Sequence, residues 1–266
     1  MHVIAVATLD VIGAGFLFLL GLFLRKRIDS RSGRVSLFLA GLILAVPGLL
    51  FALYYTHLFD NAAWFYRFRI LRFTEFLPAG LGLFAGIAYA WFDPESLGER
   101  LVIPAGLLVL VLTPFVKPLL DPIELERLRG ICESEVCMQS TFSTCGPSSA
   151  ATLLKEFGET ASEKQLAREC LTSRSGTEIW YIARAFERRG FRASIVIQRP
   201  EDLSPPSPAI AGVVLPGGAG HFIAIMSVTP EEVTIGDPMK GKFVVKRADL
   251  RAYYHFTGFF LVVQPQ

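Results

Sequence analysis

The chain has 266 residues and a formal net charge of +2, and 52% of its residues are hydrophobic. The small net charge, and the absence of a basic stripe interleaved with aromatic residues, argue against a nucleic-acid partner. Soluble domains are usually about 45–50% apolar, so the excess has to be located, and nearly all of it lies before residue 120.

Four apolar runs fill this first part of the chain, at about residues 3–24, 35–55, 70–91 and 101–120. A bilayer core takes about 20 apolar residues as a helix, so residues 1–120 are predicted to form about four transmembrane helices in a lipid bilayer. The alternatives are a cleaved signal peptide for the first run, or buried helices of a soluble protein. No basic residue precedes the first run and no small-residue cleavage site follows it, which favours membrane spans.

The charged loops predict an orientation. The loop 25-RKRIDSRSGR-34 is strongly basic, and cytoplasmic loops are enriched in Lys and Arg. Everything after the fourth span would then lie outside, although Arg67, Arg69 and Arg72 would lie outside too and oppose this interpretation. We expect an integral protein of a bacterial inner membrane with an extracytoplasmic C-terminal domain.

The polar second half predicts a soluble α+β domain. Residues 121–136 are expected to be a linker or short helix, and residues 137–266 to form the domain. Helices are predicted at 145–157, 162–171, 177–189 and 248–254, and strands at 193–197, 209–215, 221–228, 232–237, 243–246 and 258–263. The loop 200–208 contains several prolines, which disrupt regular pairing. Helices followed by antiparallel strands indicate an α+β fold.

Cys145 stands at the start of the first of these helices, in 145-CGPSSAATLLKEFG-158. Pro147 fits the first helical turn, where an N–H would be unpaired anyway. A helix N-terminus lowers the pKa of a thiol and favours the thiolate, and Gly146 would leave room for a substrate carbonyl. Cys145 is therefore a candidate nucleophile; the alternative is a small buried hydrophobic residue.

A nucleophilic thiol needs a base. Of the histidines His2, His57, His221 and His255, the first two belong to the membrane region, and His255 is expected to pack near a helix end. His221 begins a predicted strand and is the candidate base. Asp237 ends the neighbouring strand, so its carboxylate would orient the imidazole; alternatively, it is only the turn residue of an Asp-Pro pair, and His221 is a surface residue.

Gln139 is the candidate oxyanion donor. It lies six positions before Cys145, so its side-chain amide and the backbone N–H of Cys145 could bind a developing negative charge. The alternative is a solvated loop glutamine.

Taken together, the order Gln, Cys-Gly-Pro, His at a strand start and Asp-Pro after the next strand resembles the papain-like cysteine peptidases. It is most similar to the bacteriocin-processing family, which cleaves leader peptides after a double glycine. The matching stretches are Gln139, 145-CGPSSAATLLKEFG-158, 176-GTEIWYIARAFERRGFRASIV-196, 206-PSPAIAGVV-214, 221-HFIAI-225 and 236-GDPMKGKF-243. The resemblance implies that Cys145 is the nucleophile, His221 the general base and acid, Asp237 the orienting carboxylate and Gln139 the oxyanion donor.

One feature departs from many members of that family, in which the peptidase domain precedes an ATP-driven exporter. This sequence contains no GxxxxGK[ST] motif, so we expect it not to use ATP, and a transporter partner would be a separate protein. The expected function is a membrane-anchored cysteine peptidase acting on leader or signal-type peptides, with the double-glycine preference left open. The alternatives are a catalytically silent module that binds or senses peptides, and acyl transfer to an amine.

The remaining cysteines are Cys132, Cys137 and Cys170. An oxidising compartment would allow a disulfide among them, and Cys132–Cys137 is the shortest option. The run 132-CESEVC-137 lacks a second Cys or His pair at zinc-ligand spacing, so neither a metal nor another cofactor is expected.

Overall fold

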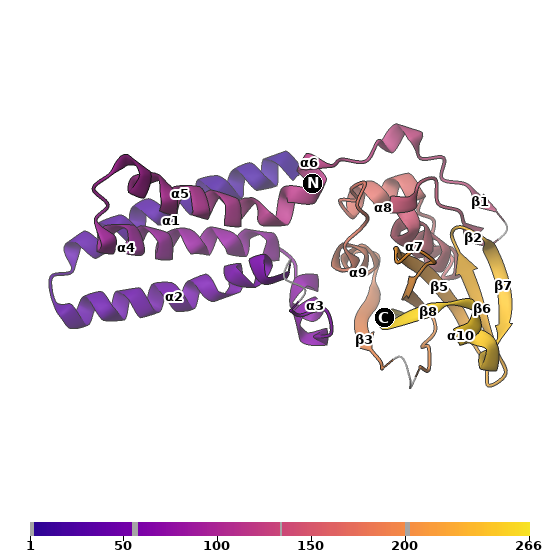
Figure 1. Ribbon diagram of the computed structural model, residues 1–266. Helices are drawn as coiled ribbons and strands as arrows, with labels where there is room; N and C mark the ends of the chain where they lie inside the picture. Colours follow the sequence, from indigo (N-terminus) through magenta and orange to yellow (C-terminus); the bar gives the residue numbers. More distant parts are fainter. Residues whose placement is uncertain (1–2, 55–57, 134, 200–202) are drawn as a thin grey trace. The chain divides into compact units, whose positions relative to one another are not determined.

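The computed structural model of the chain describes residues 3–54, 58–133, 135–199 and 203–266 (Figure 1). It contains two compact units, Met1–Asn61 with Phe73–Leu120, and Ala62–Arg72 with Asp121–Gln266. The short segment Ala62–Arg72, which lies between the second and third apolar runs, therefore folds with the C-terminal half of the chain. His2, His57 and the predicted loop residues 200–202 lie outside the described residues.

The N-terminal unit is helical. Four of its described stretches are long and apolar enough to cross a membrane, Val3–Arg27, Arg31–Phe51, Thr74–Phe92 and Leu97–Leu120. Its helices are α1 (Val3–Arg27), α2 (Arg31–Tyr54), α4 (Leu81–Phe92), α5 (Leu97–Leu112) and α6 (Val116–Leu120), with 3-10 segments at Thr74–Gly80 and Thr113–Phe115.

The third of these stretches begins later than the sequence analysis expected. Helix α3 (Ala63–Ile70) ends before it, and Phe73 has a left-handed backbone with φ of 66°. The chain resumes as a 3-10 helix from Thr74 that contains Pro78. Residues 70–72 are consequently not part of the third apolar helix, and they belong to the C-terminal unit.

Helices α1 and α4 approach each other closely at two glycines of α4. A Cβ atom added to Gly82 would lie 2.1 Å from the carbonyl oxygen of Ala14, and one added to Gly86 would lie 2.0 Å from that of Phe18. Small residues at this spacing let helix backbones pack in direct contact, which is a principal source of helix association in membranes.

The C-terminal unit places helices first and a sheet after them. Its helices are α3, α7 (Cys145–Glu156), α8 (Glu163–Glu169), α9 (Ile179–Glu187) and α10 (Leu250–Tyr253). Its large sheet consists of β3 (Phe191–Ile197), β4 (Ala209–Val214), β5 (Gly220–Val228), β6 (Glu232–Asp237), β7 (Gly241–Lys246) and β8 (His255–Pro265). The strand order is β3-β8-β4-β5-β6-β7, and every neighbouring pair is antiparallel. The predicted α+β architecture is confirmed.

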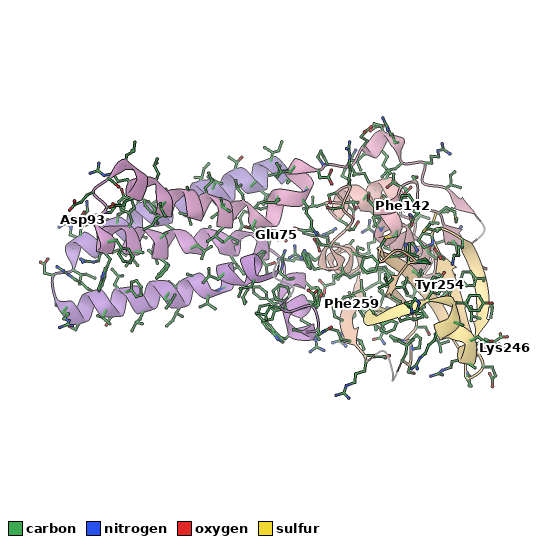
Figure 2. All side chains as sticks on the ribbon, in the orientation of Figure 1. Glu75, Asp93, Phe142, Lys246, Tyr254 and Phe259 are labelled. Carbon is green, nitrogen blue, oxygen red and sulfur yellow. A yellow bond between two sulfur atoms is a disulfide. The ribbon has the colours of Figure 1, made fainter. Side chains whose placement is uncertain are left out.

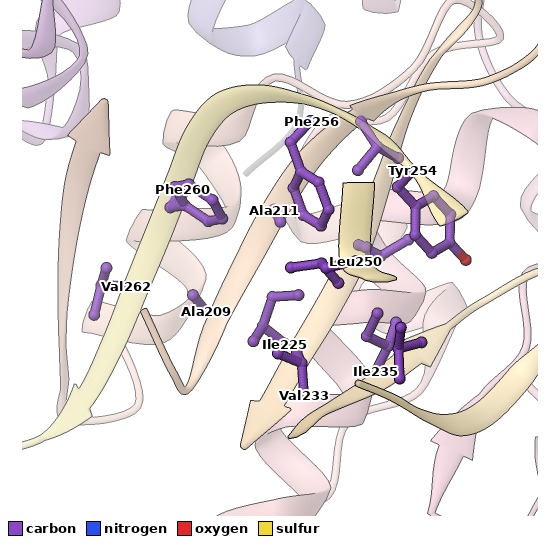
Figure 3. Packing of buried hydrophobic residues seen from close by; sticks show 13 residues of the cluster. Ala209, Ala211, Ile225, Val233, Ile235, Leu250, Tyr254, Phe256, Phe260 and Val262 are labelled. Atoms are coloured by element: carbon purple, nitrogen blue, oxygen red, sulfur yellow. The ribbon is translucent and has the colours of Figure 1, made fainter. Parts of the chain in front are cut away.

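The central strands β4, β5 and β6 are largely buried on both faces, whereas alternate residues of the edge strand β7 are exposed. Alternate residues of a strand point to opposite faces, and one set forms the hydrophobic cluster in Figure 3 together with Leu250 and Tyr254. On the other face, the space beside Gly236 of β6 is filled by Thr152 of α7. Buried strands of this kind give near-continuous apolar runs, which explains why the strands were recognisable in the sequence.

The segment Ala62–Arg72 is anchored in this unit by Arg184 of α9. The last carbonyls of a helix lack intrahelical partners, and the Arg184 guanidinium donates to those of Ile70 at 2.9 Å, Leu71 at 2.7 Å and Arg69. The guanidinium of Arg69 in turn lies 4.1 Å from the ring centre of Trp180. A cation over an aromatic face is attracted by the ring quadrupole. Arg184 of α9 and Arg69 of α3 therefore each link the two helices.

Aromatic side chains of α3 complete this contact. Phe65 and Tyr66 are buried, and the Tyr66 ring packs edge-on against Phe259 of β8 with 4.9 Å between centroids. Phe259 is labelled in Figure 2. A helix this short is marginal in isolation, so these packing contacts are what stabilise α3.

Residues 121–136 fold as part of the C-terminal unit instead of forming the expected linker. The strands β1 (Cys132–Glu133) and β2 (Val136–Cys137) pair as a short antiparallel hairpin, in which Cys132 lies opposite Cys137. The two cysteines form a disulfide, the shortest of the pairings considered from the sequence.

Gly258 of β8 gives a sharp prediction for the stability of this unit. Its φ is +80°, and a Cβ atom there would lie 1.9 Å from the carbonyl oxygen of Gln198. Gly258→Ala should therefore destabilise the protein by roughly 2–4 kcal/mol, combining backbone strain with a steric clash. The matched control is Gly217→Ala, which has φ of +96° with nothing within 4 Å and should show the strain alone. Equal melting temperatures for the two variants would contradict this account.

Candidate active site

Cys145 is the first residue of α7 and is buried. A 3-10 turn, Phe142–Thr144, leads into it, and reciprocal hydrogen bonds between Thr141 and Thr144 close that turn. The sulfur therefore sits at the N-terminus of α7, the positive end of the helix dipole.

Gly146 was expected to leave room for a substrate carbonyl, but protein side chains lie beside it. A Cβ atom at Gly146 would lie 2.6 Å from Ile182 Cδ1 and 3.4 Å from Phe222 Cδ2. Protein side chains thus occupy that space, and the glycine allows Ile182 of α9 and Phe222 of β5 to lie close to α7.

Helix α7 is tied to the strand that carries His221. The hydroxyl of Ser149 donates to the carbonyl of Phe222, the residue after His221, at 3.1 Å. About one turn further along α7, Thr152 accepts a hydrogen bond from the backbone N–H of Cys137 at 3.0 Å. Two small hydroxyl side chains of α7 thereby fix its position against β5 and β2.

His221 and Asp237 are brought together by strand pairing. Ala224 of β5 pairs with Gly236 of β6. His221 lies three residues before Ala224, and Asp237 lies one residue after Gly236. Both side chains therefore point to the sheet face opposite to that of Ala224 and Gly236. His221 Nε2 lies 3.0 Å from Asp237 Oδ1, and both side chains are buried. Since Nε2 faces the carboxylate, Nδ1 is the ring nitrogen left for Cys145.

The pKa of His221 reflects these neighbours. Burial lowers the pKa of the ring, but hydrogen bonds to Asp237 and Cys145, together with their charges, outweigh burial and raise it to about 9. The imidazolium is therefore the favoured form near neutral pH.

Asp237 has two further partners that hold it ionised. Its Oδ1 accepts the backbone N–H of Met239 at 2.8 Å, and its Oδ2 accepts the hydroxyl of Tyr254. Burial raises the pKa of the carboxyl, but the hydrogen bonds from His221, Tyr254 and Met239 outweigh it, so the pKa lies below its ordinary value.

Gln139 lies beside this group. Its backbone N–H donates to the carbonyl of Pro238, the residue after Asp237, at 2.9 Å. Its side-chain Oε1 is buried and has no hydrogen-bond partner among the described residues. The structure thus brings Gln139 to the Asp237 turn, whereas no hydrogen bond within the described part of the chain joins its side chain to Cys145.

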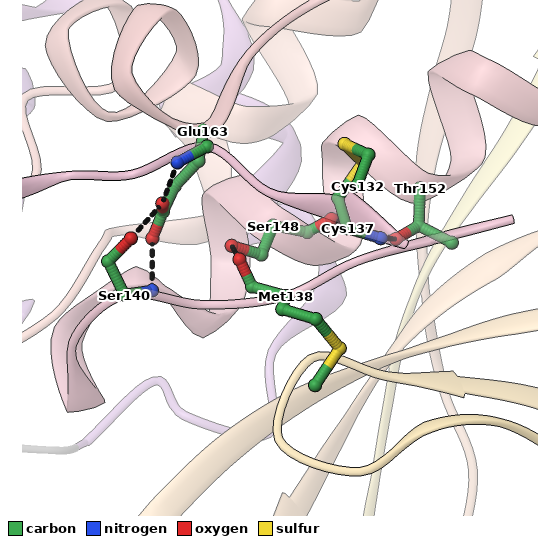
Figure 4. The surroundings of a disulfide bond; sticks show 8 residues. Cys132, Cys137, Met138, Ser140, Ser148, Thr152 and Glu163 are labelled. Carbon is green, nitrogen blue, oxygen red and sulfur yellow. Dashed lines mark hydrogen bonds between the residues drawn. A yellow bond between two sulfur atoms is a disulfide. The ribbon is translucent and has the colours of Figure 1, made fainter. Parts of the chain in front are cut away.

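Glu163, which the sequence analysis did not single out, secures the loop that carries Gln139. The backbone N–H and the hydroxyl of Ser140 both donate to its carboxylate at 2.6 Å, and the N–H of Gly130 donates at 3.2 Å (Figure 4). Charge-assisted hydrogen bonds of this kind are about twice as strong as neutral ones. The only signal in the sequence was the position of Glu163 after the helix cap Ser162.

The other candidates lie elsewhere. His255 is exposed at the start of β8, and Cys170 is buried with its pKa raised to about 12 by burial. Within the described residues, no group of three or more His, Cys, Asp or Glu side chains could hold a metal ion.

Comparison with known proteins identifies the family of the C-terminal half of the chain. The sequence model of the peptidase C39 family matches residues 133–266, half of the chain. The chain belongs to the peptidase C39 family. The resemblance to the bacteriocin-processing cysteine peptidases is thereby confirmed, and with it the papain-like fold of the C-terminal half.

Two curated relatives illustrate the range of the C39 family. An uncharacterized protein of Methanothermobacter thermautotrophicus is 34% identical over 129 residues, which cover 48% of this chain and 87% of the relative. The lactococcin-G-processing and transport ATP-binding protein LagD of Lactococcus lactis is 26% identical over 135 residues, which cover 50% of this chain and 19% of LagD.

Solved structures of C39 domains are also similar. A double glycine motif protease from an AMS/PCAT transporter, in complex with its leader peptide, is 25% identical, covers 52% of this chain and 96% of its own, and has a TM-score of 0.43. The peptidase domain of Streptococcus ComA is 22% identical, covers 48% of this chain and 96% of its own, and has a TM-score of 0.41.

Proposed function

We propose that this C39 protein is a membrane-anchored cysteine peptidase in which Cys145, His221, Asp237 and Gln139 carry out the reaction. The observation that carries the proposal is the 3.0 Å contact between His221 Nε2 and Asp237 Oδ1. It occurs on the strand that Ser149 ties to the helix headed by Cys145. Membership of the family supports the reaction class, and these contacts support the roles proposed for the residues.

In the first half of the reaction, the thiolate of Cys145 attacks the carbonyl carbon of the scissile peptide bond. The C–N bond then breaks, and the His221 imidazolium gives its proton to the leaving amine. A thioester on Cys145 and a neutral imidazole remain. Asp237 stabilises the imidazolium before this transfer and holds the ring in place through Nε2.

In the second half, the neutral imidazole of His221 takes a proton from water, whose oxygen attacks the thioester carbon. The C–S bond breaks, which releases the product as a carboxylic acid and restores the thiolate and imidazolium; the acid then loses its proton to solvent water. In both halves, negative charge develops on the former carbonyl oxygen. We propose that the Gln139 amide and the Cys145 N–H bind it, since one such donor is worth about 3–4 kcal/mol.

The substrate we propose is a leader or signal-type peptide. LagD is named for processing and transport, and the AMS/PCAT protease was solved with a leader peptide. The partner we propose is a separate transporter that receives the processed peptide.

We further propose that the peptidase unit lies outside the cytoplasmic membrane. The disulfide Cys132–Cys137 supports an oxidising compartment. Helix α3 and the C-terminal residues form one unit, so they must lie on the same side of the membrane. The two spans between them are consistent with this, because an even number of spans returns the chain to the same side. Arg69, which opposed this orientation, is buried against Trp180, so it is part of the fold and not a free loop charge.

The test of the peptidase proposal is product analysis by mass spectrometry. The full-length protein in lipid nanodiscs is incubated with a peptide library in ¹⁸O-labelled water, with Cys145→Ala as control. Hydrolysis predicts new carboxyl termini carrying one ¹⁸O atom, and none with the variant. Amide products without the label would instead support acyl transfer, and peptide binding without products in either protein would support a silent binding module.

The orientation is tested by adding trypsin to intact spheroplasts that contain the protein. Cleavage within the C-terminal unit without lysis is the expected result, since that unit would be exposed to the added protease. Protection until the membrane is permeabilised would place the unit in the cytoplasm and contradict the proposal.

A further inference from the structure

Asp237 is bonded on both carboxylate oxygens, but only one of them serves His221. Oδ1 accepts from His221 Nε2 and from the N–H of Met239, whereas Oδ2 accepts the hydroxyl of Tyr254. A carboxylate held at one oxygen can rotate about its terminal bond, since that torsion is broad. The bond from Tyr254 removes this freedom, because it holds the second oxygen as well.

The setting of Tyr254 leaves its hydroxyl little choice of partner. The residue caps the end of α10 and is 4% exposed. Its ring packs in the apolar cluster, 6.3 Å from the ring of Phe243 and 6.1 Å from that of Phe256. Figure 3 shows the phenol oxygen pointing out of this cluster. A buried hydroxyl is costly without a partner, so the ring packing directs the O–H to Asp237.

From this arrangement we infer that Tyr254 is a positioning residue of the proposed peptidase site, acting on His221 through Asp237. The inference rests on the proposed roles of Cys145, His221 and Asp237. Without the hydroxyl, Oδ2 would be a buried carboxylate oxygen with no donor, and the carboxylate would rotate or take up a proton. Either change weakens its hold on the His221 imidazolium, and through it on the Cys145 thiolate.

The charges around this pair are few. His221 faces Asp237 from β5 and is itself bonded to Cys145. From the turn after β6, Lys240 Nζ lies 4.0 Å from Asp237 Oδ2 and 4.7 Å from the centre of the Tyr254 ring. More than half of the Lys240 side chain is exposed, so water screens its charge, and it cannot replace a direct hydrogen bond.

Burial and the bond to Asp237 both raise the pKa of Tyr254 above its ordinary value. The phenol therefore stays protonated, and remains a donor, throughout the pH range in which His221 titrates. The hydroxyl is thus a constant part of the site and not a switch.

The chain offers a matched control in the preceding residue. Tyr253 also stacks beside Phe243, at 6.4 Å between centroids, but it is 59% exposed. Tyr254→Phe and Tyr253→Phe each delete one oxygen from neighbouring aromatic residues. Only the first deletion removes a hydrogen bond to Asp237.

Two measurements on the full-length protein test the inference without relying on peptide turnover. The first is the pKa of His221 from NMR of histidine-labelled protein, and the second is the alkylation rate of Cys145 by iodoacetamide as a function of pH, measured in a Cys170→Ala background. Tyr254→Phe should lower the pKa of His221 by about one unit or more, a tenfold change in proton affinity, and the alkaline step of the alkylation profile should move down in pH by the same amount. Tyr253→Phe should leave both unchanged.

A double-mutant comparison separates positioning from mere packing. If Tyr254 acts through Asp237, then Tyr254→Phe should have no added effect in an Asp237→Asn background. An unchanged His221 pKa and alkylation profile in Tyr254→Phe, or equal added shifts with and without Asp237, would overturn the inference. Failure of the wild-type protein to cleave peptides would instead count against the proposed function, and the two failures are therefore distinguishable.

Discussion

Cys145→Ala should abolish peptide hydrolysis, with a loss in kcat of roughly 10⁶-fold, the scale found when a covalent nucleophile is removed. No other described side chain can replace it, because Cys145 alone stands at the start of α7 beside the His221 imidazolium. The Asp237, His221 and Gln139 groups would remain in place but would have no sulfur to activate. The measurement is the initial rate of product formation on a peptide that the wild-type protein cleaves.

The other free cysteine provides the matched control. Cys170 is buried, and burial raises its pKa to about 12, so it stays a protonated thiol at neutral pH and cannot act as a nucleophile. Cys170→Ala should keep kcat within a factor of a few. An electrophilic peptide probe should modify Cys145 and leave Cys170 unlabelled. Equal loss of activity in the two variants would show that the thiol at position 145 has no special role.

The second large effect is expected for His221→Ala, with a loss in kcat/KM of about 10²–10⁴-fold. This substitution removes the proton donor for the leaving amine and the base for the attacking water, and it strands Asp237 as a buried carboxylate with only Tyr254 and Met239 as donors. Peptide binding should persist, so the loss should appear mainly in kcat. A variant with an unchanged kcat would contradict the assignment of His221 as the base.

The pKa of His221 predicts the pH dependence of the wild-type protein. The folded-state pKa is about 9, above the ordinary histidine value of 6.5. The imidazolium is therefore present below the folded pKa, and kcat should fall as pH rises through about 9. The raised pKa also contributes to the stability of the fold. This contribution is complete below about pH 6.5 and is lost as pH rises through about 9. Both alkaline changes should be absent or displaced in His221→Ala.

Local patterns in the sequence were sufficient for the order of elements in the C-terminal unit. Cap and stop residues define the helices: Ser162 accepts from the N–H of Gln165, and Gly158 takes the left-handed backbone that follows α7. The strands were recognisable as apolar runs between turn residues. The ends were less accurate, since β8 extends over His255–Pro265, well beyond 258–263, and it begins before Gly258, which was expected to start the strand.

The membership of α3 in the C-terminal unit was not predictable, because it depends on pairs that are far apart in sequence. Arg184 caps the carbonyls of Ile70 and Leu71 across more than a hundred residues. From the sequence, Arg69 and Arg72 were interpreted as loop charges that bear on the orientation of the chain in the membrane. The packing of Arg69 on Trp180 becomes visible only when α9 is placed against α3.

The candidate site shows the same division. Cys145, His221 and Asp237 were found from local signals: a helix start, a strand start and a strand end. Tyr254 and Glu163 were missed, because each acts through hydrogen bonds to residues that are distant in sequence. In the sequence, both residues lie in segments that resemble ordinary helix. The interpretation of Gly146 was incomplete for a related reason, because Ile182, which fills the space beside it, comes from a different helix.

The most direct measurement of the central claim is capture of the covalent intermediate. The full-length protein is mixed with an activated peptide ester, quenched in acid and digested, and the acylated residue is located by mass spectrometry. The account predicts one acyl group, on Cys145, that forms quickly and then decays as product is released, and that accumulates in His221→Ala if it forms at all. Turnover of the peptide with no adduct on Cys145, or an adduct confined to another residue, would contradict it.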